Sequence, residues 1–384
     1  MSLLSTAGRF RFDLSPPNSG RGLSARQGGE SASKCRLAGT GWNDSTRQAL
    51  ECLISRGSGK QLSVVFDFDN TIVCGDIGEA TLAVLARGGT LTPANVPPEL
   101  CPPFRVPGRK WVRMPACAAV TEYYEALLAP TAHLQRDPTP LANGYSWAVE
   151  VMAGLRPIDI IEATRTAYEW SADKRAHRPA IIEVTPGKTG YVAPVFYAEI
   201  VELIAELARH RFEIWIVSAS NVWSVRWMVL EALNPLLRER GLKRGLRSDH
   251  VIGISCLLQD PGGGLYKDSL LVRENEGYAA LDEKVLARFH LTSRLQFPLP
   301  TYAGKVACIL DALGRNPFLA VGDSPGDHPM LLVSANRLWI ARREKPGYLR
   351  ATRELMRKTG SAGWMFQAAG ATPTPGFVPG EIAS

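Results

Sequence analysis

The chain has 384 residues, of which 45% are hydrophobic and 21% are charged, and its formal net charge is +7. This length allows a large core or a core domain with an inserted one, and the absence of any apolar run of about 18 residues excludes a conventional transmembrane helix. The positive charges are interleaved with acids and no aromatic stripe accompanies them, so we expect neither a nucleic-acid nor a membrane partner.

The beginning of the chain is rich in Ser, Gly and Arg, and we expect residues 1–38 to be disordered or to lie upstream of the true start. The sequence holds seven cysteines, an odd number, without a CxxC pair. Reduced, buried thiols are the simplest interpretation of this pattern, and they predict a cytoplasmic location. The sequence leaves the oligomeric state open.

From Trp42 onward, the periodicity of the apolar residues predicts strands that alternate with helices. The first element is a helix that Asn43 or Asp44 can cap, and it leads into a short apolar strand. The predicted strands are 62–66, 212–217, 251–256, 318–321 and 337–340. Such alternation is typical of a parallel sheet with right-handed crossovers, so we predict an α/β fold with a Rossmann-like, doubly wound core.

The segment between the first two strands differs from the rest of the chain. It begins with a proline-rich connector around Pro93–Pro107 and continues with helical apolar stripes, which predict a mostly helical insertion. The end of the chain is rich in Gly and Pro, and we expect it to be flexible. The predicted parts are a core at 39–77 and 193–364, a helical cap insertion at 78–192 and a flexible tail at 365–384.

Three of the predicted strands end in polar clusters. The clusters have the sequences DFD, SAS and GDSPGD, and they begin at Asp67, Ser218 and Gly322. An acidic turn such as the first can simply cap a strand, because Asp is common in turns. In parallel sheets, however, ligands bind beyond the carboxyl ends of the strands. The shared position of the three clusters therefore predicts one site.

The predicted site contains four carboxylates, which belong to Asp67, Asp69, Asp323 and Asp327. So much negative charge needs a divalent cation, and oxygen ligands of this kind suit Mg²⁺. One carboxylate could attack phosphorus and form an aspartyl-phosphate, which splits hydrolysis into two easier steps. Another could protonate the leaving alkoxide and then deprotonate the attacking water.

A hydroxyl at Ser218 and a lysine would cradle the oxygens of a phosphate group. Two of the lysines between the second and third clusters are candidates. Lys267 stands beside a Gly-rich segment, whereas Lys305 opens a helix that leads into the strand before Asp323. The N-terminus of that helix would favour an anion, so we prefer Lys305.

The combination of DxDxT at the end of one strand, Ser at the end of another, and Lys before GDxxxD resembles the haloacid dehalogenase superfamily of phosphatases. The resemblance covers roughly residues 60–80 and 195–345. It implies that Asp67 is the nucleophile and that Asp69 is the general acid and base. It also implies phosphate binding by Ser218, Lys305, Asn70 and Thr71, with Thr71 supporting the loop through its hydroxyl, and metal binding by Asp67, Asp69 through its carbonyl, Asp323 and Asp327.

The position of the insertion matches the cap of the phosphoserine phosphatase-like branch, which covers the site and selects the substrate. In phosphoserine phosphatases an acid nine positions after the nucleophile contacts the substrate amine, and Asp76 stands there, with Glu79 nearby. Asp76 could equally cap the following helix. A phosphoserine phosphatase would also need an arginine for the substrate carboxylate, and Arg156 or Arg165 could serve.

A closer resemblance is to the phosphorylcholine phosphatase family, through DFDNT with Asn70, the Trp-led first helix, SAS and a long cap. The members of this family are usually exported, whereas we expect this protein to be cytoplasmic. A quaternary ammonium is held by aromatic faces, although most aromatic side chains are core residues. The aromatic residues of the insertion that we consider are Trp111, Tyr123, Tyr124, Tyr145, Trp147 and Trp170.

The sequence thus predicts a Mg²⁺-dependent phosphomonoester hydrolase that acts on a small phosphorylated metabolite, in particular an amino-alcohol phosphate such as phosphocholine. A phosphoserine phosphatase, or another small-molecule phosphatase, is the alternative within the same class. A binding protein that keeps the fold but has lost the chemistry is the alternative of a different class.

Overall fold

The computed structural model describes residues 35–105, 111–128, 144–170, 180–187, 189–371 and 375–380, all within one compact unit, Cys35–Ser384. The expectation of disorder for residues 1–34 lies outside the described residues. At residues 35–38 it is wrong, because Cys35 and Leu37 are buried. The backbone N–H of Leu37 donates to Glu51 Oε1 at 2.8 Å and that of Ala38 donates to Glu202 Oε1 at 2.7 Å, which fixes the segment.

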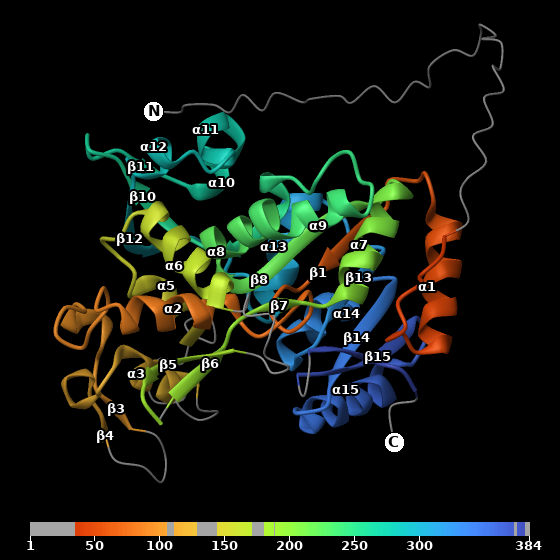
Figure 1. Ribbon diagram of the computed structural model, residues 1–384, viewed down its shortest axis with the longest axis horizontal. Coiled ribbons are helices and arrows are strands. Elements are labelled where there is room, and N and C mark those ends of the chain that lie inside the picture. Colours follow the sequence, from red (N-terminus) through yellow and green to blue (C-terminus); the bar gives the residue numbers. More distant parts are fainter. Residues whose placement is uncertain are drawn as a thin grey trace, which may run out of the picture. The chain divides into compact units, whose positions relative to one another are not determined.

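A seven-stranded sheet forms the centre of this unit (Figure 1). Its strand order is β16-β15-β14-β13-β1-β8-β9, and all neighbours are parallel except β15 and β16. The predicted α/β, doubly wound architecture is therefore confirmed. The strands are β1 Ser63–Phe66, β8 Glu213–Asn221, β9 Val251–Ile254, β13 Leu319–Gly322, β14 Asn336–Arg342, β15 Trp364–Gly370 and β16 Gly376–Val378.

Strand β1 lies at the point where the strand order reverses. The chain leaves β1 for β8 on one side and later returns to β13 on the other, so Val65 pairs with both Trp215 and Ala320. All four residues of β1 are buried, as expected for a strand covered on both faces. Such a switch point leaves a crevice beyond the carboxyl ends of β1 and β13, which places the two acidic clusters side by side.

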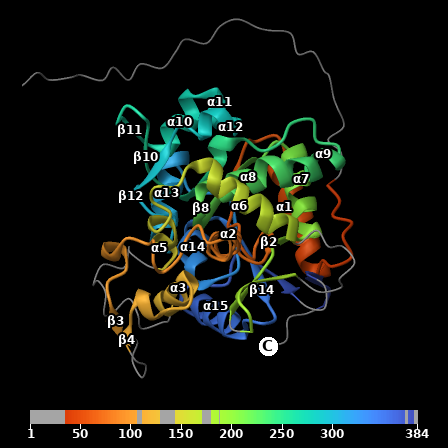
Figure 2. The same cartoon turned by 60° about the vertical axis from the view of Figure 1, so that its left-hand side comes forward.

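Helices cover both faces of the sheet (Figures 1 and 2). Val64 and Phe66 face one layer, while Val65 faces the other together with Ile309 and Met330, because successive residues of a strand point to opposite faces. None of the described helices has the length and apolar content to cross a membrane. The helices that cover the sheet are α1 Asp44–Gly57, α7 Ala198–Arg209, α8 Val222–Trp227, a π-helix Met228–Leu233, α9 Asn234–Glu239, α13 Ala303–Leu313, α14 His328–Val333 and α15 Pro346–Thr359.

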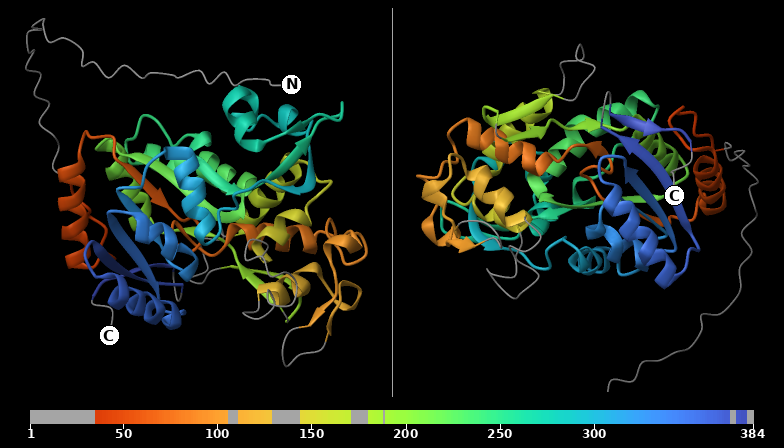
Figure 3. Two further views of the ribbon diagram at one scale, coloured as in Figure 1. Left: turned by 180° about the vertical axis from the view of Figure 1, so that it is seen from behind. Right: turned by 90° about the horizontal axis from the view of Figure 1, so that it is seen from below.

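The segment between β1 and β8 is mostly helical in its described part, as predicted. In the view from below in Figure 3, this segment and the strands β14–β16 lie on opposite sides. A short strand pair, β2 Val73–Cys74 with β7 Val195–Phe196, joins its two ends. Its elements are α2 Ile77–Arg87, α3 Val120–Leu128, α5 Gly144–Glu150 and α6 Pro157–Trp170, 3-10 turns Pro98–Leu100 and Met114–Ala116, and the hairpins β3 Phe104–Arg105 with β4 Trp111–Val112 and β5 Ile181–Thr185 with β6 Thr189–Val192.

A smaller three-stranded sheet and short helices lie between β9 and α13. The sheet has the order β11-β10-β12 and is antiparallel. Its strands are β10 Cys256–Gln259, β11 Leu265–Tyr266 and β12 His290–Leu295, and the nearby helices are α10 Asp268–Glu274, α11 Glu276–Ala279 and α12 Glu283–Leu286. Two further 3-10 turns are Ser248–His250 and Pro325–Asp327. The seven cysteines, all among the described residues, are free thiols.

The expected flexible tail, 365–384, is wrong in its described part, because β15 and β16 complete the main sheet there. Gln367 is fully buried, and its side-chain oxygen accepts a 2.8 Å hydrogen bond from the backbone N–H of Asn43. Phe377 lies edge-on to Trp42, with ring centroids 5.0 Å apart. The glycine and proline content that suggested a loose end surrounds two short apolar runs that pair as strands.

Candidate active site

Asp67 follows β1 directly and lies at the carboxyl end of the strand. The backbone N–H of Asp67 donates to the Val321 carbonyl at 2.9 Å, which continues the pairing between β1 and β13 by one residue. The next residue, Phe68, is fully buried, and the Phe68 carbonyl accepts a 2.8 Å hydrogen bond from Ile72 N–H. These hydrogen bonds fix the loop that follows β1, and they hold Asp67 at the end of the strand.

Lys305 neutralises two of the predicted carboxylates at once. It lies in the first turn of α13, and its ammonium is 2.6 Å from Asp67 Oδ1 and 2.6 Å from Asp327 Oδ1. Burial alone would lower the pKa of Lys305, but Asp327 and Asp67 outweigh burial and raise it. Lys267, the rival lysine, is exposed and directly precedes α10. The structure therefore places Lys305, and not Lys267, beside the carboxylates.

Asp327 serves mainly to shape the loop after β13. Its Oδ2 accepts hydrogen bonds from the backbone N–H groups of Asp323 and Ser324, both at 3.1 Å. A Cβ atom on Gly322 would come within 2.6 Å of the Asp327 Cβ, so this position needs glycine. Asp327 also accepts from the Ser324 hydroxyl at 3.2 Å and pairs with Lys305, so its carboxylate has more partners than that of Asp67 or Asp323 and is less suited to bind an ion directly.

Asp323 faces Asp67 across the site and has a cationic partner that the sequence analysis missed. Arg342, near the end of β14, places its Nε 2.8 Å from Asp323 Oδ2. Thr71 Oγ1 lies 3.2 Å from both Asp67 Oδ2 and Asp323 Oδ1. Thr71 is fully buried, so its position fits the expected support of the loop and argues against the expected contact with phosphate.

The carboxylates of Asp67, Asp323 and Asp327 lie close enough to hold a metal ion, since one oxygen from each falls within 4.8 Å of the others. Burial raises the pKa of Asp323 well above its usual value, and the like charges of Asp327 and Asp67 add to this rise while Arg342 opposes it. A divalent cation would relieve this repulsion. Oxygen-only ligands fit Mg²⁺, so Asp67 and Asp323 suit the predicted ion.

Asp69 points to a different set of partners. Its Oδ2 accepts hydrogen bonds from Ser218 Oγ at 2.9 Å and Ser220 Oγ at 2.8 Å, and its Oδ1 accepts from Ile77 N–H at 2.7 Å. Ser218 was expected to bind phosphate, but in this structure its hydroxyl is buried against Asp69. Ser220 was missed as a site residue, although the SAS sequence places it two residues after Ser218, on the same side of the strand.

Burial raises the pKa of both carboxylates after β1, and different neighbours add to this rise. Burial and then the nearby Asp327 raise the pKa of Asp67 to about 7, against the opposing effect of Lys305. Burial and then Asp76 raise the pKa of Asp69 to about 7, against the opposing hydrogen bonds from Ile77 and the two serines. Two carboxyl groups with separate partners can take separate roles in one reaction.

Asn70 shapes the turn that follows Asp69. Its backbone has a φ of 57°, in the left-handed region that Asn tolerates better than most residues. Its side-chain oxygen accepts a 3.3 Å hydrogen bond from Gly75 N–H, and its own N–H donates to the Gly75 carbonyl at 3.0 Å. Asn70 also lines the cavity described below, so its expected contact with phosphate stays a prediction.

The two predicted substrate residues lie at the start of α2. Asp76 caps this helix, with Oδ1 accepting from Glu79 N–H at 2.9 Å, and it also lies 3.3 Å from Ser220 Oγ. Glu79 accepts a 3.1 Å hydrogen bond from the Tyr124 hydroxyl. Burial, and then the charge of Glu79, raises the pKa of Asp76 to about 7. Both readings of Asp76, as a cap and as part of the site, therefore fit the structure.

A cavity of about 190 Å³ lies over the carboxylates and connects these parts. A second, much smaller space beside it has Asp76, Tyr145 and Ala219 in common with the first, and also contacts Glu79 and Tyr124. We call this second space the acidic chamber. The residues of the main cavity include Asp67, Asp69, Asp76, Tyr145, Tyr302, Lys305, Asp323, Arg342 and Tyr348.

Only two of the six aromatic residues considered from the sequence, Tyr124 and Tyr145, line the acidic chamber. Trp111 is 57% exposed. Tyr123 and Trp147 belong to the core of the insertion, where they donate hydrogen bonds to the carbonyls of Pro102 and Leu100. The sixth, Trp170, stacks under the guanidinium of Arg87 at 4.8 Å.

We expect the charge of Glu79 to lower the stability of the fold above neutral pH. Burial raises the pKa of Glu79 from 4.5 to about 7. Below pH 4.5 the group is protonated in both the folded and unfolded states, so it costs nothing. Above pH 7 it is ionised in both, and the folded state bears the cost. Glu79→Gln keeps the acceptor for Tyr124 and should raise the free energy of unfolding at pH 8 by about 1–2 kcal/mol.

Urea denaturation of wild type and Glu79→Gln at pH 8 and at pH 4.5 measures this difference. The stabilisation should vanish at the lower pH. The exposed Glu274→Gln, at the end of α10, serves as the control and should change stability at neither pH. An equal stabilisation by Glu79→Gln at both pH values would contradict the electrostatic explanation.

No family model matches the chain, and no curated protein matches it either. Among solved structures, a conserved protein of unknown function from Anaerococcus prevotii DSM 20548 matches with a TM-score of 0.57 and 18% identity, over 89% of this chain and 98% of its own. A protein of unknown function from Bordetella pertussis Tohama I matches with a TM-score of 0.43 and 16% identity, over 79% of this chain and 96% of its own. A substrate-bound phosphoserine phosphatase matches with a TM-score of 0.36 and 13% identity, over 78% of this chain and 98% of its own. The first of these likenesses shows that the fold recurs in another protein.

Proposed function

We propose that the protein is a Mg²⁺-dependent phosphomonoester hydrolase that acts through an aspartyl-phosphate on a small amino-alcohol phosphate, such as phosphocholine. The observation that carries this proposal is the arrangement of Asp67 and Asp69. They follow the same buried strand, yet one is paired with Lys305 and the other with Ser218 and Ser220. The resemblance to haloacid dehalogenase phosphatases supports the same assignment of roles.

In the first step, an oxygen of Asp67 attacks phosphorus and the bond from phosphorus to the alcohol oxygen breaks. The charge of Lys305, 2.6 Å from Asp67, would hold the phosphate oxygens near this carboxylate. A bound Mg²⁺, for which Asp67, Asp323 and the Asp69 carbonyl are the proposed ligands, would supply further neutralisation of the phosphoryl charge.

Asp69 would move the protons. With a pKa of about 7 it can carry a proton at neutral pH and give it to the departing alkoxide. The carboxylate left behind can then take a proton from the water that attacks the aspartyl-phosphate, which releases inorganic phosphate and restores Asp67. Hydrogen bonds from Ser218 and Ser220 hold the carboxylate of Asp69 in position between the two steps.

The acidic side of the main cavity, where Asp76 lies and the acidic chamber of only about 10 Å³ adjoins, supports a cationic alcohol as the leaving group. Asp76 and Glu79 supply negative charge there, and Tyr124 and Tyr145 supply aromatic surface. Both are features that favour a substituted ammonium. The main cavity, at about 190 Å³, is smaller than the pockets that hold drug-sized ligands, which supports a small metabolite rather than a nucleic acid.

The two arginines considered for a phosphoserine phosphatase do not line this cavity. Arg156 pairs with Asp159, and Arg165 lies 3.7 Å from Glu283, both as partly exposed side chains. The arginine that does line the cavity, Arg342, is already paired with Asp323. The substrate carboxylate of phosphoserine would therefore lack a free arginine among the described residues that line this cavity.

Phosphate release by the purified full chain tests the proposal. With Mg²⁺ we expect hydrolysis of p-nitrophenyl phosphate, and a kcat/KM for phosphocholine about tenfold or more above that for phosphoserine, equivalent to roughly 1.4 kcal/mol of discrimination. Phosphoethanolamine should lie between them. Glu79→Gln should remove most of this preference and leave the activity on p-nitrophenyl phosphate.

Two outcomes would overturn parts of this proposal. A preference for phosphoserine would replace the amino-alcohol substrate by the alternative. A folded protein that hydrolyses none of these esters in Mg²⁺, but binds phosphocholine by calorimetry, would establish a binding protein that has lost the chemistry.

A further inference from the structure

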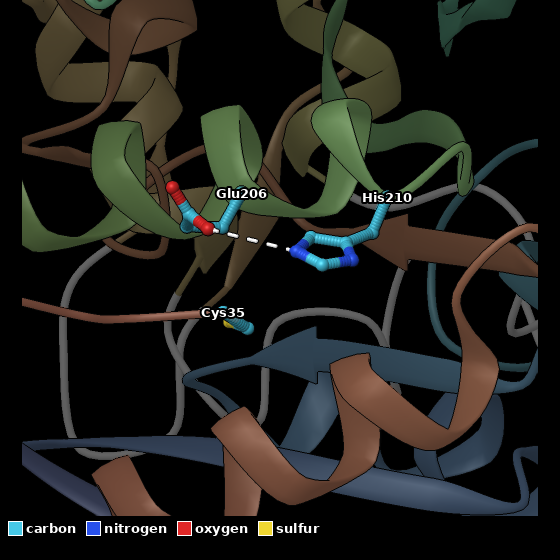
Figure 4. A group of neighbouring side chains, drawn as sticks. All are labelled: Cys35, Glu206 and His210. Atoms are coloured by element: carbon cyan, nitrogen blue, oxygen red, sulfur yellow. Dashed lines mark ion pairs between the residues drawn. The ribbon is translucent and has the colours of Figure 1, made fainter. Parts of the chain in front are cut away.

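A second group of potential ligands lies away from the sheet crevice, around the C-terminus of α7. A sulfur atom of Cys35, a carboxylate oxygen of Glu206 and a ring nitrogen of His210 all fall within 4.8 Å of one another. Figure 4 shows these side chains converging from α7 and from the segment that precedes α1. Cys35 and His210 are 3% and 5% exposed, so the group is enclosed by protein.

The helix itself brings two of these groups together. Glu206 and His210 are four residues apart, a spacing that places two side chains on the same face of a helix. Cys35 comes from a segment that α7 also holds through a neighbouring acid, because Glu202 accepts hydrogen bonds from Ala38 N–H and Trp42 Nε1 at 2.7 and 2.9 Å. Hydrogen bonds to Glu202 therefore hold the segment that carries Cys35 against α7.

The imidazole of His210 is oriented as a ligand would be. Its Nδ1 lies 2.9 Å from Ser58 Oγ. With Nδ1–H donating to this hydroxyl, Nε2 carries a free lone pair, and Nε2 is buried without a hydrogen-bond partner. Glu206 Oε2 lies 3.9 Å from Nε2. Metal-binding histidines commonly donate one ring N–H to a hydrogen-bond acceptor, which orients the other ring nitrogen toward the metal.

The separation of 3.9 Å is too long for a hydrogen bond but close to the distance between two ligands of one ion. Zinc binds nitrogen and oxygen at about 2.0–2.2 Å and sulfur at about 2.3 Å, so tetrahedral ligand atoms lie roughly 3.3–3.8 Å apart. A small movement of the Glu206 carboxylate would bring it into this range.

The surroundings of Cys35 also favour a cation. The carboxylates of Glu206, Glu51 and Glu202 act on its thiol, and Glu206 also forms a hydrogen bond with it. The side chain that offsets them at the helix end, Arg209, pairs with Glu206 from the exposed side. A divalent cation would compensate these acids from within and would displace the thiol proton.

We propose that Cys35, Glu206 and His210 bind a zinc ion, which fastens the segment before α1 to the end of α7. The mixture of sulfur, nitrogen and oxygen ligands suits zinc and not the oxygen-seeking Mg²⁺ of the sheet crevice. A water molecule completes the tetrahedron. The site is structural, and it shares no residue with the proposed hydrolase chemistry.

Cobalt substitution tests this site in the full chain. After chelation and addition of Co²⁺, the wild type should show the sulfur-to-cobalt charge-transfer absorption of a thiolate ligand. The carboxylates of the sheet crevice offer no sulfur, so cobalt there cannot produce this band. Cys35→Ser should lose it, whereas Cys52→Ser, at an exposed free cysteine of α1, should keep it.

Zinc binding adds an independent measurement. One equivalent should be retained per chain and should raise the melting temperature, and His210→Gln should abolish this shift. Ser58→Ala should weaken the zinc affinity about tenfold through the orientation of the ring. Phosphatase activity in Mg²⁺ should be the same for Cys35→Ser and Cys52→Ser. Absence of the charge-transfer band in the wild type, or its persistence in Cys35→Ser, would show a buried His–Glu pair only and overturn the proposal.

Discussion

Asp67→Asn should reduce the Mg²⁺-dependent hydrolysis of p-nitrophenyl phosphate by about 10⁴-fold or more, because the proposed nucleophile is lost. Asn is close in size and can still accept a hydrogen bond from Lys305, so the fold should remain intact. The substitution also removes one of the two carboxylates, Asp67 and Asp327, that Lys305 balances. Folding should therefore be checked by circular dichroism and thermal unfolding beside the kinetic measurement.

A matched control and a direct trap make this test specific. Asp311→Asn changes an exposed carboxylate on the same helix as Lys305 and should keep full activity. Rapid acid quench with ³²P-labelled substrate should label the wild-type protein but not Asp67→Asn. Labelling that survives in Asp67→Asn would mean that another residue is the nucleophile.

Asp69→Asn should affect the proposed substrate and the aryl ester unequally. Phosphocholine releases a strongly basic alkoxide that needs a proton, whereas p-nitrophenolate leaves without one. The ratio kcat/KM reports the steps up to release of the alcohol, so the loss of the general acid should lower it for phosphocholine by about 10²–10⁴-fold and for the aryl ester much less.

The same variant separates the two chemical roles of Asp69. Hydrolysis of the aspartyl-phosphate needs a base for either substrate, so kcat on the aryl ester should fall as well, and labelled intermediate should accumulate. These measurements require a steady-state comparison of both substrates and one quench experiment. Equal losses of kcat/KM for the two esters would contradict the assignment of Asp69 as the acid.

The position of the site was predictable because it depends on features that sequence shows directly. Runs of buried residues mark parallel strands, and polar residues directly after them must gather at one edge of the sheet. This reasoning brought Asp67, Asp323 and Lys305 together. It also predicted the start of α1, where Asn43 caps the helix through hydrogen bonds to the N–H groups of Ser45 and Thr46.

Other features depend on contacts between segments that no local pattern reveals. Arg342 lies beyond the predicted strand 337–340, and the parallel pairing of β13 with the longer β14 places it beside Asp323. The link from Asp69 through Ser220 to Asp76 crosses three elements. The closing strand β16 was missed because its residues acquire strand structure by pairing with β15, which a composition rich in Gly and Pro hides.

The buried amide of Gln367 connects segments that lie far apart in the sequence. Its nitrogen donates to the carbonyls of Gly41 and Val378, at 3.0 and 3.2 Å, and its oxygen accepts from Asn43 N–H. Residues from both extremities of the described chain thus share one side chain. The start of α1 and the last two strands of the sheet therefore depend on each other, because loss of those strands would remove the partner of the Asn43 N–H.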